Sequence, residues 1–320
     1  MAPLLATTHR PHIRYGLGDD AAVWQPSRSH RSVMSTDVSV EGVHFRRDFS
    51  SAQDIGFRVL AVSLSDLAAM GAKPVLATIA VTLPGDVTND WLLTAYEGMV
   101  ELARRTGTPL VGGDLSRGAA LSFAVTVVGE VSPQRLALRS GARPRDVLAV
   151  TGALGRSQAG LALLQNPKLG HGLAVDLAND ALLAYRRPEP RLAYAKFLAA
   201  SKHLHAMLDL SDGLSLDLQR LTQASACGAT LTKIPIAAST QAIATAAKAD
   251  ALAWARDAGE DYELLCSIDR RAFPYLAHRF EQHFSAVLHP IGYCTPSKEL
   301  VQLIDDTPQP LIAAGWDHFR

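Results

Sequence analysis

Cysteine is scarce in this sequence, and neither sign of charge is in excess. The three cysteines, Cys227, Cys266 and Cys294, lie far apart and form no C-x-x-C pair. This spacing argues against a disulfide framework and against a zinc site. Lys+Arg and Asp+Glu each number 31, so the formal net charge is zero. Such a chain is a poor candidate for a nucleic-acid binder that depends on a basic face.

Long apolar runs are also missing. The first thirty residues contain basic side chains, among them Arg10 and Arg14, and no extended hydrophobic stretch. We therefore predict neither a signal peptide nor a membrane span, and we expect a reducing cytoplasm as the compartment. The chain is still 48% hydrophobic over 320 residues, which is enough for a large core in two domains.

Strands and helices are predicted to alternate, which is typical of an α/β or α+β layered fold. Residues 31–37 and 74–85 have the composition of strands. Apolar residues recur at helical spacing over 52–70. A second helix is expected over 89–107, with one of its first two residues as the cap and a glycine at its end.

A stretch rich in Arg, Gly and Pro at residues 139–146 has the composition of a linker. A strand, a glycine turn and a helix are expected directly after it. We therefore place the domain boundary near residue 137. This division predicts an N-terminal domain over 1–137 and a C-terminal domain over 138–320.

Acidic residues recur at the edges of apolar segments, close to Gly, Ser or Thr. They are Asp19, Asp20, Asp37, Asp66, Asp114, Asp209, Asp212, Glu260 and Asp261. A single acid of this kind is usually a cap or a turn residue, and Asp212 could cap a helix that begins near Leu214. So many similar positions are hard to attribute to turns alone. We therefore predict that several of them meet in one pocket.

A pocket of carboxylates needs positive charge. Two like charges about 4 Å apart repel by roughly 4 kcal/mol at an effective dielectric near 20. Around Asp209, Asp212 and Asp217 the sequence offers no Lys or Arg nearer than Lys202 and Arg220. Fixed oxygen ligands suit Mg²⁺ rather than zinc. Because protein-bound Mg²⁺ commonly holds substrate phosphates as further ligands, the pattern indicates a nucleotide site.

The usual phosphate-binding motifs are absent. The sequence contains no G-x-x-x-x-G-K-[ST] loop and no set of protein-kinase catalytic motifs. A phosphate site that is rich in Asp and poor in Lys must use metal ions to neutralise charge. We therefore predict metal-assisted phosphoryl transfer, in which positioning and electrostatics lower the barrier.

Eight short motifs follow one another over nearly the whole chain. In order they are GLGDDAAV, STDVSVEGVHF, SLSDLAAMGAKP, VGGDLSRG, RSGARPRD, LDLSDGL, AGEDYEL and GWDHF. Each is weak to moderate alone, but their order and spacing together are specific. In these motifs the chain resembles the bacterial thiamine-monophosphate kinase family.

This resemblance implies the two-domain fold of the aminoimidazole ribonucleotide synthetase superfamily. The N-terminal domain is expected to bind ATP and Mg²⁺ and to pair its sheet with that of a second subunit in a barrel-like homodimer. The C-terminal α/β domain is expected to complete the nucleotide and thiamine-phosphate site. The implied reaction is direct, in-line transfer of the ATP γ-phosphoryl group to thiamine monophosphate, assisted by several Mg²⁺ ions.

The matching motifs also imply site residues. The implied metal ligands are Asp20, Ser35, Thr36, Asp37, Asp66, Asp114, Asp209 and Asp212. Among them, the residues expected to be essential are Asp37, Asp66, Asp114 and Asp212. The implied ATP contacts are Gly113, Asp114, Arg139 and Ser211. The implied thiamine-phosphate contacts are His44, Glu260 and Trp316.

Other interpretations stay open. His44 could be a half-buried histidine, Arg139 a surface arginine and Trp316 an anchor for the chain end. The chain could be another ATP-dependent enzyme of the superfamily, but selenophosphate synthetase needs a reactive Cys or selenocysteine near its N-terminus, and the first Cys here is Cys227. A non-enzymatic protein that binds divalent cations or nucleotides is the other alternative.

Overall fold

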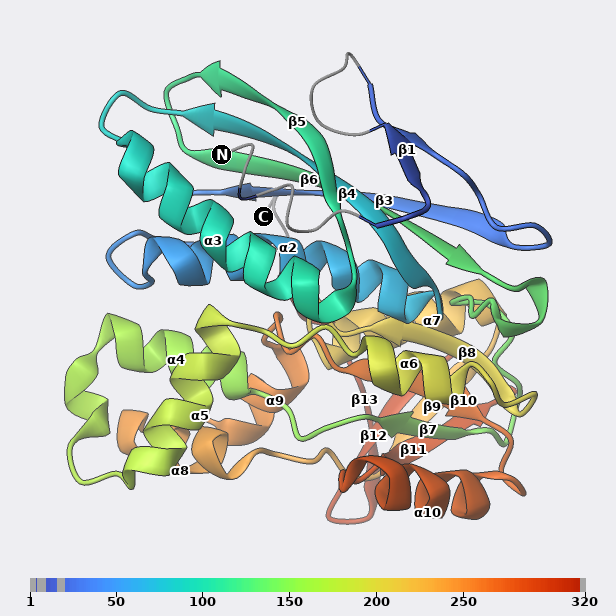
Figure 1. Cartoon of the computed structure of the whole chain (residues 1–320). Coiled ribbons are helices and arrows are strands. Elements are labelled where there is room, and N and C mark those ends of the chain that lie inside the picture. Colours follow the sequence, from blue (N-terminus) through green and yellow to red (C-terminus); the bar gives the residue numbers. More distant parts are fainter. Residues whose placement is uncertain (1–3, 5–9, 16–20, 317–320) are drawn as a thin grey trace. The chain divides into compact units, whose positions relative to one another are not determined.

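The computed structural model describes residue 4, residues 10–15 and residues 21–316. The chain divides into two compact units, Met1–Leu136 and Ala137–Arg320 (Figure 1). Residues 139–146, expected as a linker, belong to the second unit. None of the helices in the described part of the chain combines the length and the apolar composition that crossing a membrane requires.

The N-terminal unit is built on a four-stranded sheet with the order β3-β6-β4-β5. Its strands are β3 (Arg31–Val40), β6 (Ser122–Val131), β4 (Lys73–Leu83) and β5 (Leu110–Arg117). β4 and β5 run parallel, and the other neighbours are antiparallel. The strands predicted at 31–37 and 74–85 are thus confirmed as β3 and β4. In the described residues β3 and β5 are free edges, so this sheet is open and not a closed barrel.

Two helices lie on one face of this sheet (Figure 1). They are α2 (Ala52–Ala69), which contacts β3, β6 and β4, and α3 (Asn89–Thr106), which lies beside α2. Both predicted helices are therefore confirmed. The cap of α3 differs from the prediction, because the Thr88 side chain accepts the hydrogen bond from Trp91 N at 3.2 Å.

Helices α2 and α3 touch backbone to backbone. A Cβ at Gly56 would lie 1.7 Å from the Ala95 carbonyl oxygen, and one at Gly98 would lie 1.8 Å from the Gln53 carbonyl oxygen. No side chain fits at either position unless the helices move apart. The two glycines therefore set the distance between α2 and α3.

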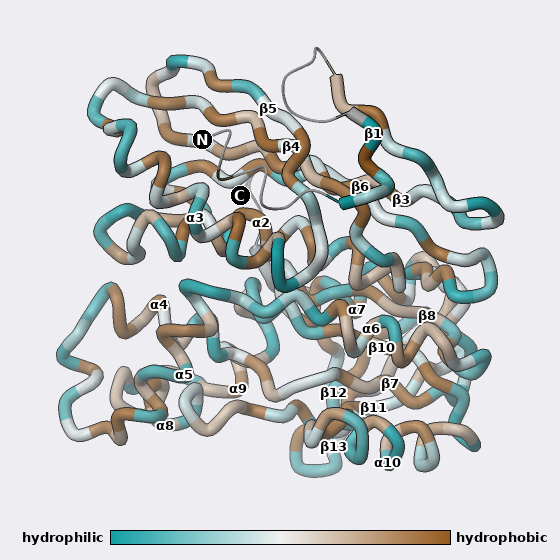
Figure 2. Tube along the Cα trace, in the orientation of Figure 1, coloured by the Kyte–Doolittle hydropathy of each residue, from teal (hydrophilic) through white to brown (hydrophobic). Residues whose placement is uncertain are grey.

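The other face of the sheet is only partly covered. A short ladder of β1 (Ile13–Tyr15) and β2 (Val23–Trp24) forms an apolar cluster with Leu76 of β4. Elsewhere on this face Met34 and Val38 are 73% and 52% exposed. Figure 2 shows the apolar stretches that run along β4 and β6 in brown.

The C-terminal unit contains a seven-stranded mixed sheet with the order β13-β12-β9-β11-β7-β10-β8. The strands are β13 (Thr307–Pro310), β12 (Leu300–Ile304), β9 (Gly228–Leu231), β11 (His289–Thr295), β7 (Val147–Val150), β10 (Leu264–Ile268) and β8 (Leu204–Asp209). Of these neighbours only β12 and β9 run parallel.

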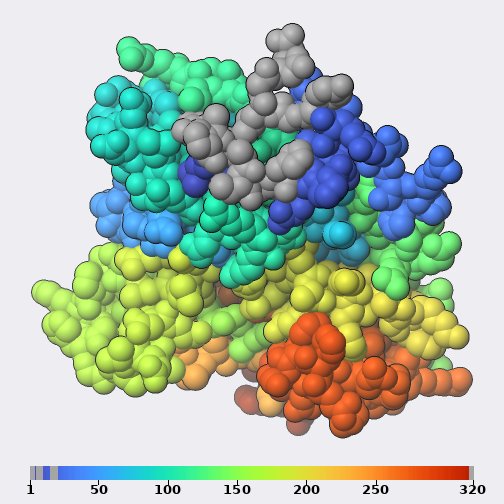
Figure 3. Space-filling view, viewed as in Figure 1, coloured from blue at the N-terminus to red at the C-terminus, as the bar shows by residue number. Residues whose placement is uncertain are grey.

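Seven described α-helices complete this unit. They are α4 (Arg156–Gln165), α5 (Val175–Arg186), α6 (Leu192–Leu198), α7 (Leu214–Ser225), α8 (Ala238–Ala247), α9 (Ala251–Asp257) and α10 (Phe273–Phe284). The main core packs α7 against the sheet through Leu218 and Leu221, which meet Leu148, Leu208 and Leu265. Helices α4 and α5 form part of the unit's surface (Figure 3, yellow-green).

The contact between α2 and α3 predicts that Gly98→Ala destabilises the protein. The added methyl group must push α3 away from the Gln53 carbonyl, and overpacking of this kind costs about 1–3 kcal/mol. A lowered midpoint in thermal and urea unfolding checks this. Gly85→Ala is the matched control, because nothing lies within 4 Å of its added Cβ. Equal midpoints for the two variants would contradict the close helix contact.

Candidate active site

The first group of expected site residues lies where β3 meets α2. Strand alternation turns Ser35 and Asp37 toward α2, and that helix carries Asp66 near its end. The Ser35 hydroxyl donates a hydrogen bond to Asp66 Oδ2. Asp37 Oδ2 is buried, and no donor among the described residues reaches it. The structure thus brings three of the implied metal ligands together.

The charge of this group is poorly compensated. Burial raises the pKa of Asp37 to about 6, and the neighbouring Asp66 carboxylate adds to the rise. A hydrogen bond from Ser63, one turn before Asp66 on α2, offsets only part of it. A cation beside Asp37 would relieve both causes of the raised pKa. The group therefore has the properties of a hard-oxygen cation site.

Thr36 projects from the opposite face of β3. Its hydroxyl shares a hydrogen bond of 2.8 Å with the Thr126 hydroxyl on β6. The side chain therefore does not join Ser35 and Asp37. Only the main chain of Thr36 lies next to that group.

Gly113 and Asp114 lie on the edge strand β5, and β6 and β4 separate them from β3. The exposed Asp114 carboxylate accepts a hydrogen bond of 2.8 Å from the Ser116 hydroxyl. Gly113 allows a close approach to β4, since a Cβ there would lie 1.9 Å from the Ile79 carbonyl oxygen. In the N-terminal unit, Asp114 and Asp37 therefore lie on strands that are not neighbours.

The second group lies in the loop between β8 and α7. Asp209 ends β8 and is buried, and Asp212 stands two residues before α7. Arg220 Nη1 donates hydrogen bonds to Asp212 Oδ2 and to Asp217 Oδ1, the latter at 2.7 Å. The expectation that no cation pairs with these acids is therefore wrong. The helix places Arg220 one turn beyond Asp217, a spacing at which side chains meet.

Asp212 does not cap α7. The residue at the cap position is Gly213, and it provides no side-chain hydrogen bond. Instead the Asp217 carboxylate accepts a hydrogen bond of 3.0 Å from the Asp212 backbone N–H. Burial raises the pKa of Asp217 to about 6, although this N–H and Arg220 oppose the rise. The interpretation of Asp212 as a helix cap is thus wrong. Its carboxylate is not used to cap α7 and can contact a ligand.

Ser211, Glu260 and Trp316 meet at the same loop. Glu260 N donates to the Ser211 carbonyl oxygen at 2.8 Å, and Trp316 N donates to the Asp212 carbonyl oxygen at 3.1 Å. The Trp316 backbone is anchored in this way, while the residue is 52% exposed. An anchoring role and a ligand-binding role for Trp316 are therefore compatible.

The remaining expected residues make local contacts of their own. His44 Nδ1 accepts a hydrogen bond of 3.0 Å from Val40 N, which leaves the proton on Nε2. The Arg139 side chain is exposed, and its carbonyl accepts a bond from the Ser225 hydroxyl at 3.0 Å. Asp20 lies outside the described residues.

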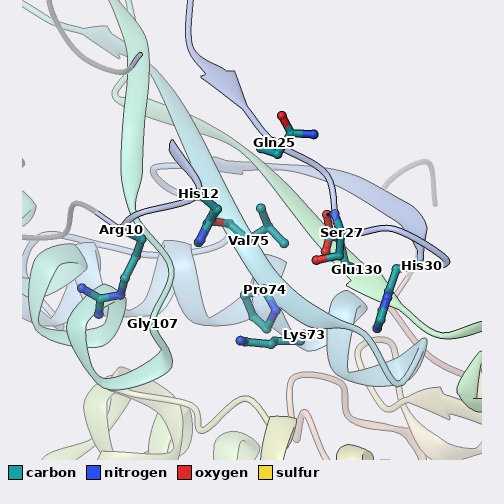
Figure 4. Close-up of a pocket in the computed structure, with 10 residues that line it drawn as sticks. All are labelled: Arg10, His12, Gln25, Ser27, His30, Lys73, Pro74, Val75, Gly107 and Glu130. Atoms are coloured by element: carbon teal, nitrogen blue, oxygen red, sulfur yellow. Dashed lines mark hydrogen bonds between the residues drawn. The ribbon is translucent and has the colours of Figure 1, made fainter. Parts of the chain in front are cut away.

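A cavity of about 360 Å³ lies in the N-terminal unit, beside the β1–β2 ladder and the start of β4 (Figure 4). Its lining includes Arg10, His12, Lys73 and Glu130. His12 Nε2 donates a hydrogen bond of 2.9 Å to the Val75 carbonyl, which fixes the β1–β2 ladder on β4. None of the expected site residues that the structure describes lines this cavity. Its permanently charged lining residues are Arg10, Lys73 and Glu130.

Two contributors to the acid groups were missed from sequence. Arg220 pairs with Asp212, and Ser63 bonds to Asp37. The spacing of Asp217 and Arg220 is a recognisable helical ion-pair signal. No local signal connects Ser63 with Asp37, because a strand and a helix meet there only in the fold.

The acid groups can be tested as magnesium sites. Among the residues that the structure describes, no three His, Cys, Asp or Glu side chains form a group that could hold a metal ion on their own. Mg²⁺ usually takes one or two carboxylates from the protein and completes its shell with water and substrate phosphates. Asp37 with Asp66, and Asp209 with Asp212, fit that donor set.

Comparison with known proteins identifies two matching domains. Residues 18–131 match the AIR synthase related protein, N-terminal domain, and residues 143–271 match the AIR synthase related protein, C-terminal domain. Thiamine-monophosphate kinase of Bacillus subtilis (strain 168) is 33% identical over 98% of this chain and 96% of its own length.

Two solved structures agree with this match. The crystal structure of thiamine-monophosphate kinase from Stenotrophomonas maltophilia K279a has a TM-score of 0.85 and 33% identity, and covers 94% of each chain. The structure of AaThiL complexed with AMPPCP and TMP has a TM-score of 0.80 and 27% identity, over 99% of this chain and 95% of that one. Because 33% sequence identity extends over nearly the whole chain and the fold is shared, we conclude that this chain belongs to the thiamine-monophosphate kinase family.

Proposed function

We propose that this protein transfers the γ-phosphoryl group of ATP to thiamine monophosphate and forms thiamine diphosphate and ADP. The observation that carries the proposal is the near full-length similarity to a structure complexed with AMPPCP and TMP. AMPPCP is ATP with a methylene group as the β,γ bridge, so that complex contains a stand-in for one proposed substrate together with the other. The reaction is the last step of thiamine diphosphate biosynthesis.

Several Mg²⁺ ions assist the reaction in this proposal. When bound, magnesium neutralises the phosphates and the carboxylates that face them. Ser35, Asp37 and Asp66 would hold it in the N-terminal unit, and this assignment is supported by the buried Asp37 Oδ2, which no donor among the described residues reaches. Asp209 and Asp212 hold it in the C-terminal unit. The further ligands proposed from the family motifs are Asp20, Thr36 and Asp114.

ATP is proposed to contact Gly113, Asp114, Arg139 and Ser211. The exposed Arg139 guanidinium suits a phosphate because it presents several N–H donors in one plane. Gly113 lies on the edge strand β5, which has β4 as its one neighbouring strand among the described residues. Ser211 stands between two proposed metal ligands in the β8–α7 loop.

Thiamine monophosphate is proposed to contact His44, Glu260 and Trp316. The exposed Trp316 ring offers an aromatic face to the cationic thiazolium. Glu260 supplies a negative charge or a hydrogen-bond acceptor for the same molecule. His44 keeps an N–H at Nε2 that can donate to the phosphate.

No residue needs to act as a general base. The attacking phosphate oxygen of thiamine monophosphate is already an anion. The protein's task is to hold two anionic substrates in line, and alignment with electrostatic stabilisation supplies most of the barrier reduction. Arg220 contributes positive charge at Asp212 and fixes the orientation of that carboxylate.

We further propose a homodimer in a reducing cytoplasm. The open sheet face of the N-terminal unit exposes Met34 and Val38, and exposed apolar faces of this kind are typical of interfaces. Pairing two such faces produces the barrel-like arrangement that the family resemblance implies.

All three cysteines are unpaired and buried, which fits a compartment where thiols stay reduced.

The alternatives are less well supported. Another ATP-dependent enzyme of the same superfamily shares the fold, but the full-length relatives described above are thiamine-monophosphate kinases. A non-enzymatic binding protein has no specific observation in its favour.

The proposed activity predicts release of ADP that depends on thiamine monophosphate. A coupled ADP assay with ATP and Mg²⁺ measures it, and mass spectrometry identifies thiamine diphosphate as the product. Omitting either thiamine monophosphate or Mg²⁺ should abolish the signal. ADP release no higher than background with all components present would defeat the proposal.

Asp212→Asn is expected to remain folded and to lose activity. Removing one electrostatic stabiliser of a transition state typically lowers kcat by about 10²–10³-fold. The lost pair with Arg220 is partly exposed, so its effect on unfolding should stay within about 1 kcal/mol. Asp48→Asn is the control, because it removes an exposed partner of Arg46 outside the site. Wild-type kcat in Asp212→Asn would exclude Asp212 as a metal ligand.

The raised pKa of Asp37 predicts a pH-dependent stability. The folded state keeps this proton up to about pH 6, whereas the unfolded chain releases it near pH 4. Without metal, stability from this group is therefore full at low pH and declines as the pH rises through about 6. Asp37→Asn should melt above the wild type at pH 7–8 and lose that advantage below about pH 4.

Added Mg²⁺ should raise the wild-type melting temperature at pH 7–8 more than that of Asp37→Asn, because bound ligand stabilises the folded state. Melting curves with and without Mg²⁺ measure both effects. Equal shifts in the two proteins would remove Asp37 from the proposed metal ligands.

A further inference from the structure

A buried carboxylate in the C-terminal unit binds two arginines that the proposed mechanism does not use. The side chain of Glu263 is 1% exposed. Arg191 donates to it through Nε at 2.9 Å and through Nη2 at 2.6 Å. Arg156 Nη2 donates at 2.9 Å, and the Thr151 hydroxyl donates at 2.7 Å. Four hydrogen bonds thus converge on one carboxylate.

These partners come from separate elements. Thr151 follows β7, Arg156 begins α4, Arg191 precedes α6, and Glu263 precedes β10. A Cβ at Gly152 would lie 2.4 Å from Glu263 Oε1, so the turn after β7 is shaped around this carboxylate. Burial opposes the charged form of Arg191, but the Glu263 carboxylate outweighs burial and raises the pKa of the arginine. We call Glu263, Arg156 and Arg191 the arginine clamp.

The segment next to the clamp has an unusual backbone. Glu260 and Tyr262 have φ angles of 70° and 50°, in the left-handed region that residues other than glycine rarely adopt. Such conformations persist only where the surroundings enforce them, and they cluster at functional sites. Glu263, the carboxylate of the clamp, lies at the end of this segment.

This segment is bonded to the acidic loop. Leu210 N donates to the Glu263 carbonyl at 2.8 Å, and Tyr262 N donates to the Leu210 carbonyl at 2.9 Å. Glu260 N donates to the Ser211 carbonyl at 2.8 Å. The three bonds therefore attach residues 260–263 to the two residues between Asp209 and Asp212.

We propose that Glu263 is a positioning residue, which acts through the arginine clamp and contacts neither substrate. The clamp holds residues 260–263 in place, with Glu260 and Tyr262 in their left-handed conformation. That segment in turn fixes the metal ligands Asp209 and Asp212 and the substrate contact Glu260. The inference rests on the proposed function for the roles of these three residues, but the geometry it describes exists without any ligand.

Glu263→Gln tests the proposal, since it keeps the shape of the side chain and removes its charge. Loss of residues that orient ligands typically weakens metal affinity or activity by about 10- to 100-fold. We expect a loss of that size in Mn²⁺ affinity, measured by calorimetric titration with Mn²⁺ as the probe. The KM for thiamine monophosphate should rise as well. Amide hydrogen exchange without metal should accelerate at Leu210, Glu260 and Tyr262.

Asp146→Asn is the matched control. Asp146 is a buried carboxylate that accepts bonds of 2.8 Å from Arg143 N, His205 Nδ1 and the Ser267 hydroxyl. It precedes β7, and the antiparallel pairing of β7 with β10 puts it at the opposite end of these strands from Glu263. This variant should lose stability, yet retain Mn²⁺ affinity, KM and slow exchange at the loop.

Arg156→Gln provides a milder test if Glu263→Gln does not fold. It removes one donor and leaves the two bonds from Arg191 in place, so the same changes should appear in smaller size. Mn²⁺ affinity and loop exchange that match those of Asp146→Asn would overturn the proposal. Amide exchange and Mn²⁺ binding can be measured without turnover. If the wild-type protein released no ADP in response to thiamine monophosphate, the proposed function would be refuted, but the positioning role of Glu263 could still be tested.

Discussion

Carboxylates that are buried close together must find positive charge, and this requirement organises both units. In the C-terminal unit an arginine supplies the positive charge, because α7 places Arg220 next to Asp212 and Asp217. In the N-terminal unit no donor among the described residues reaches Asp37 Oδ2. The acids of the β8–α7 loop are therefore partly balanced by Arg220, whereas Asp37 Oδ2 is left without a described donor.

The same requirement appears deeper in the C-terminal unit. Buried carboxylates precede β7 and β10, and each is satisfied by partners from several elements. Asp146 receives a histidine and a serine, whereas Glu263 receives two arginines. Buried ion pairs contribute little net stability and are costly to break from one side. Glu263, which has the stronger pairing, lies next to the loop that carries Asp209 and Asp212, and the proposed function requires these two carboxylates to be placed accurately.

Local pattern was sufficient to predict a good part of the fold. Apolar periodicity located α2 and α3, and β-branched composition located β4. Alternation along β3 could also have shown that Thr36 and Asp37 face opposite ways. The separation of Asp114 from Asp37 depends on strand order, which short motifs do not encode.

Contacts made only in the folded chain were the hardest to predict. The pairing of Arg220 with Asp212 forms only when the side chain of Arg220 on α7 reaches the loop that precedes this helix. The glycine contact between α2 and α3 joins residues about forty positions apart, and nothing in either local sequence marks it. Family motifs supplied many of the site residues, but they could not show which of them are neighbours.

The contact between α2 and α3 also has a consequence for temperature. Asp66 is carried on α2, and no flexible side chain separates that helix from α3 at Gly56 and Gly98. The close contact therefore couples a displacement of the α2 backbone, which carries Asp66, to α3. Heat that separates the two helices should also disturb the hydrogen bond from Ser35 to Asp66, so we expect this part of the site to be lost together with the packing of its domain.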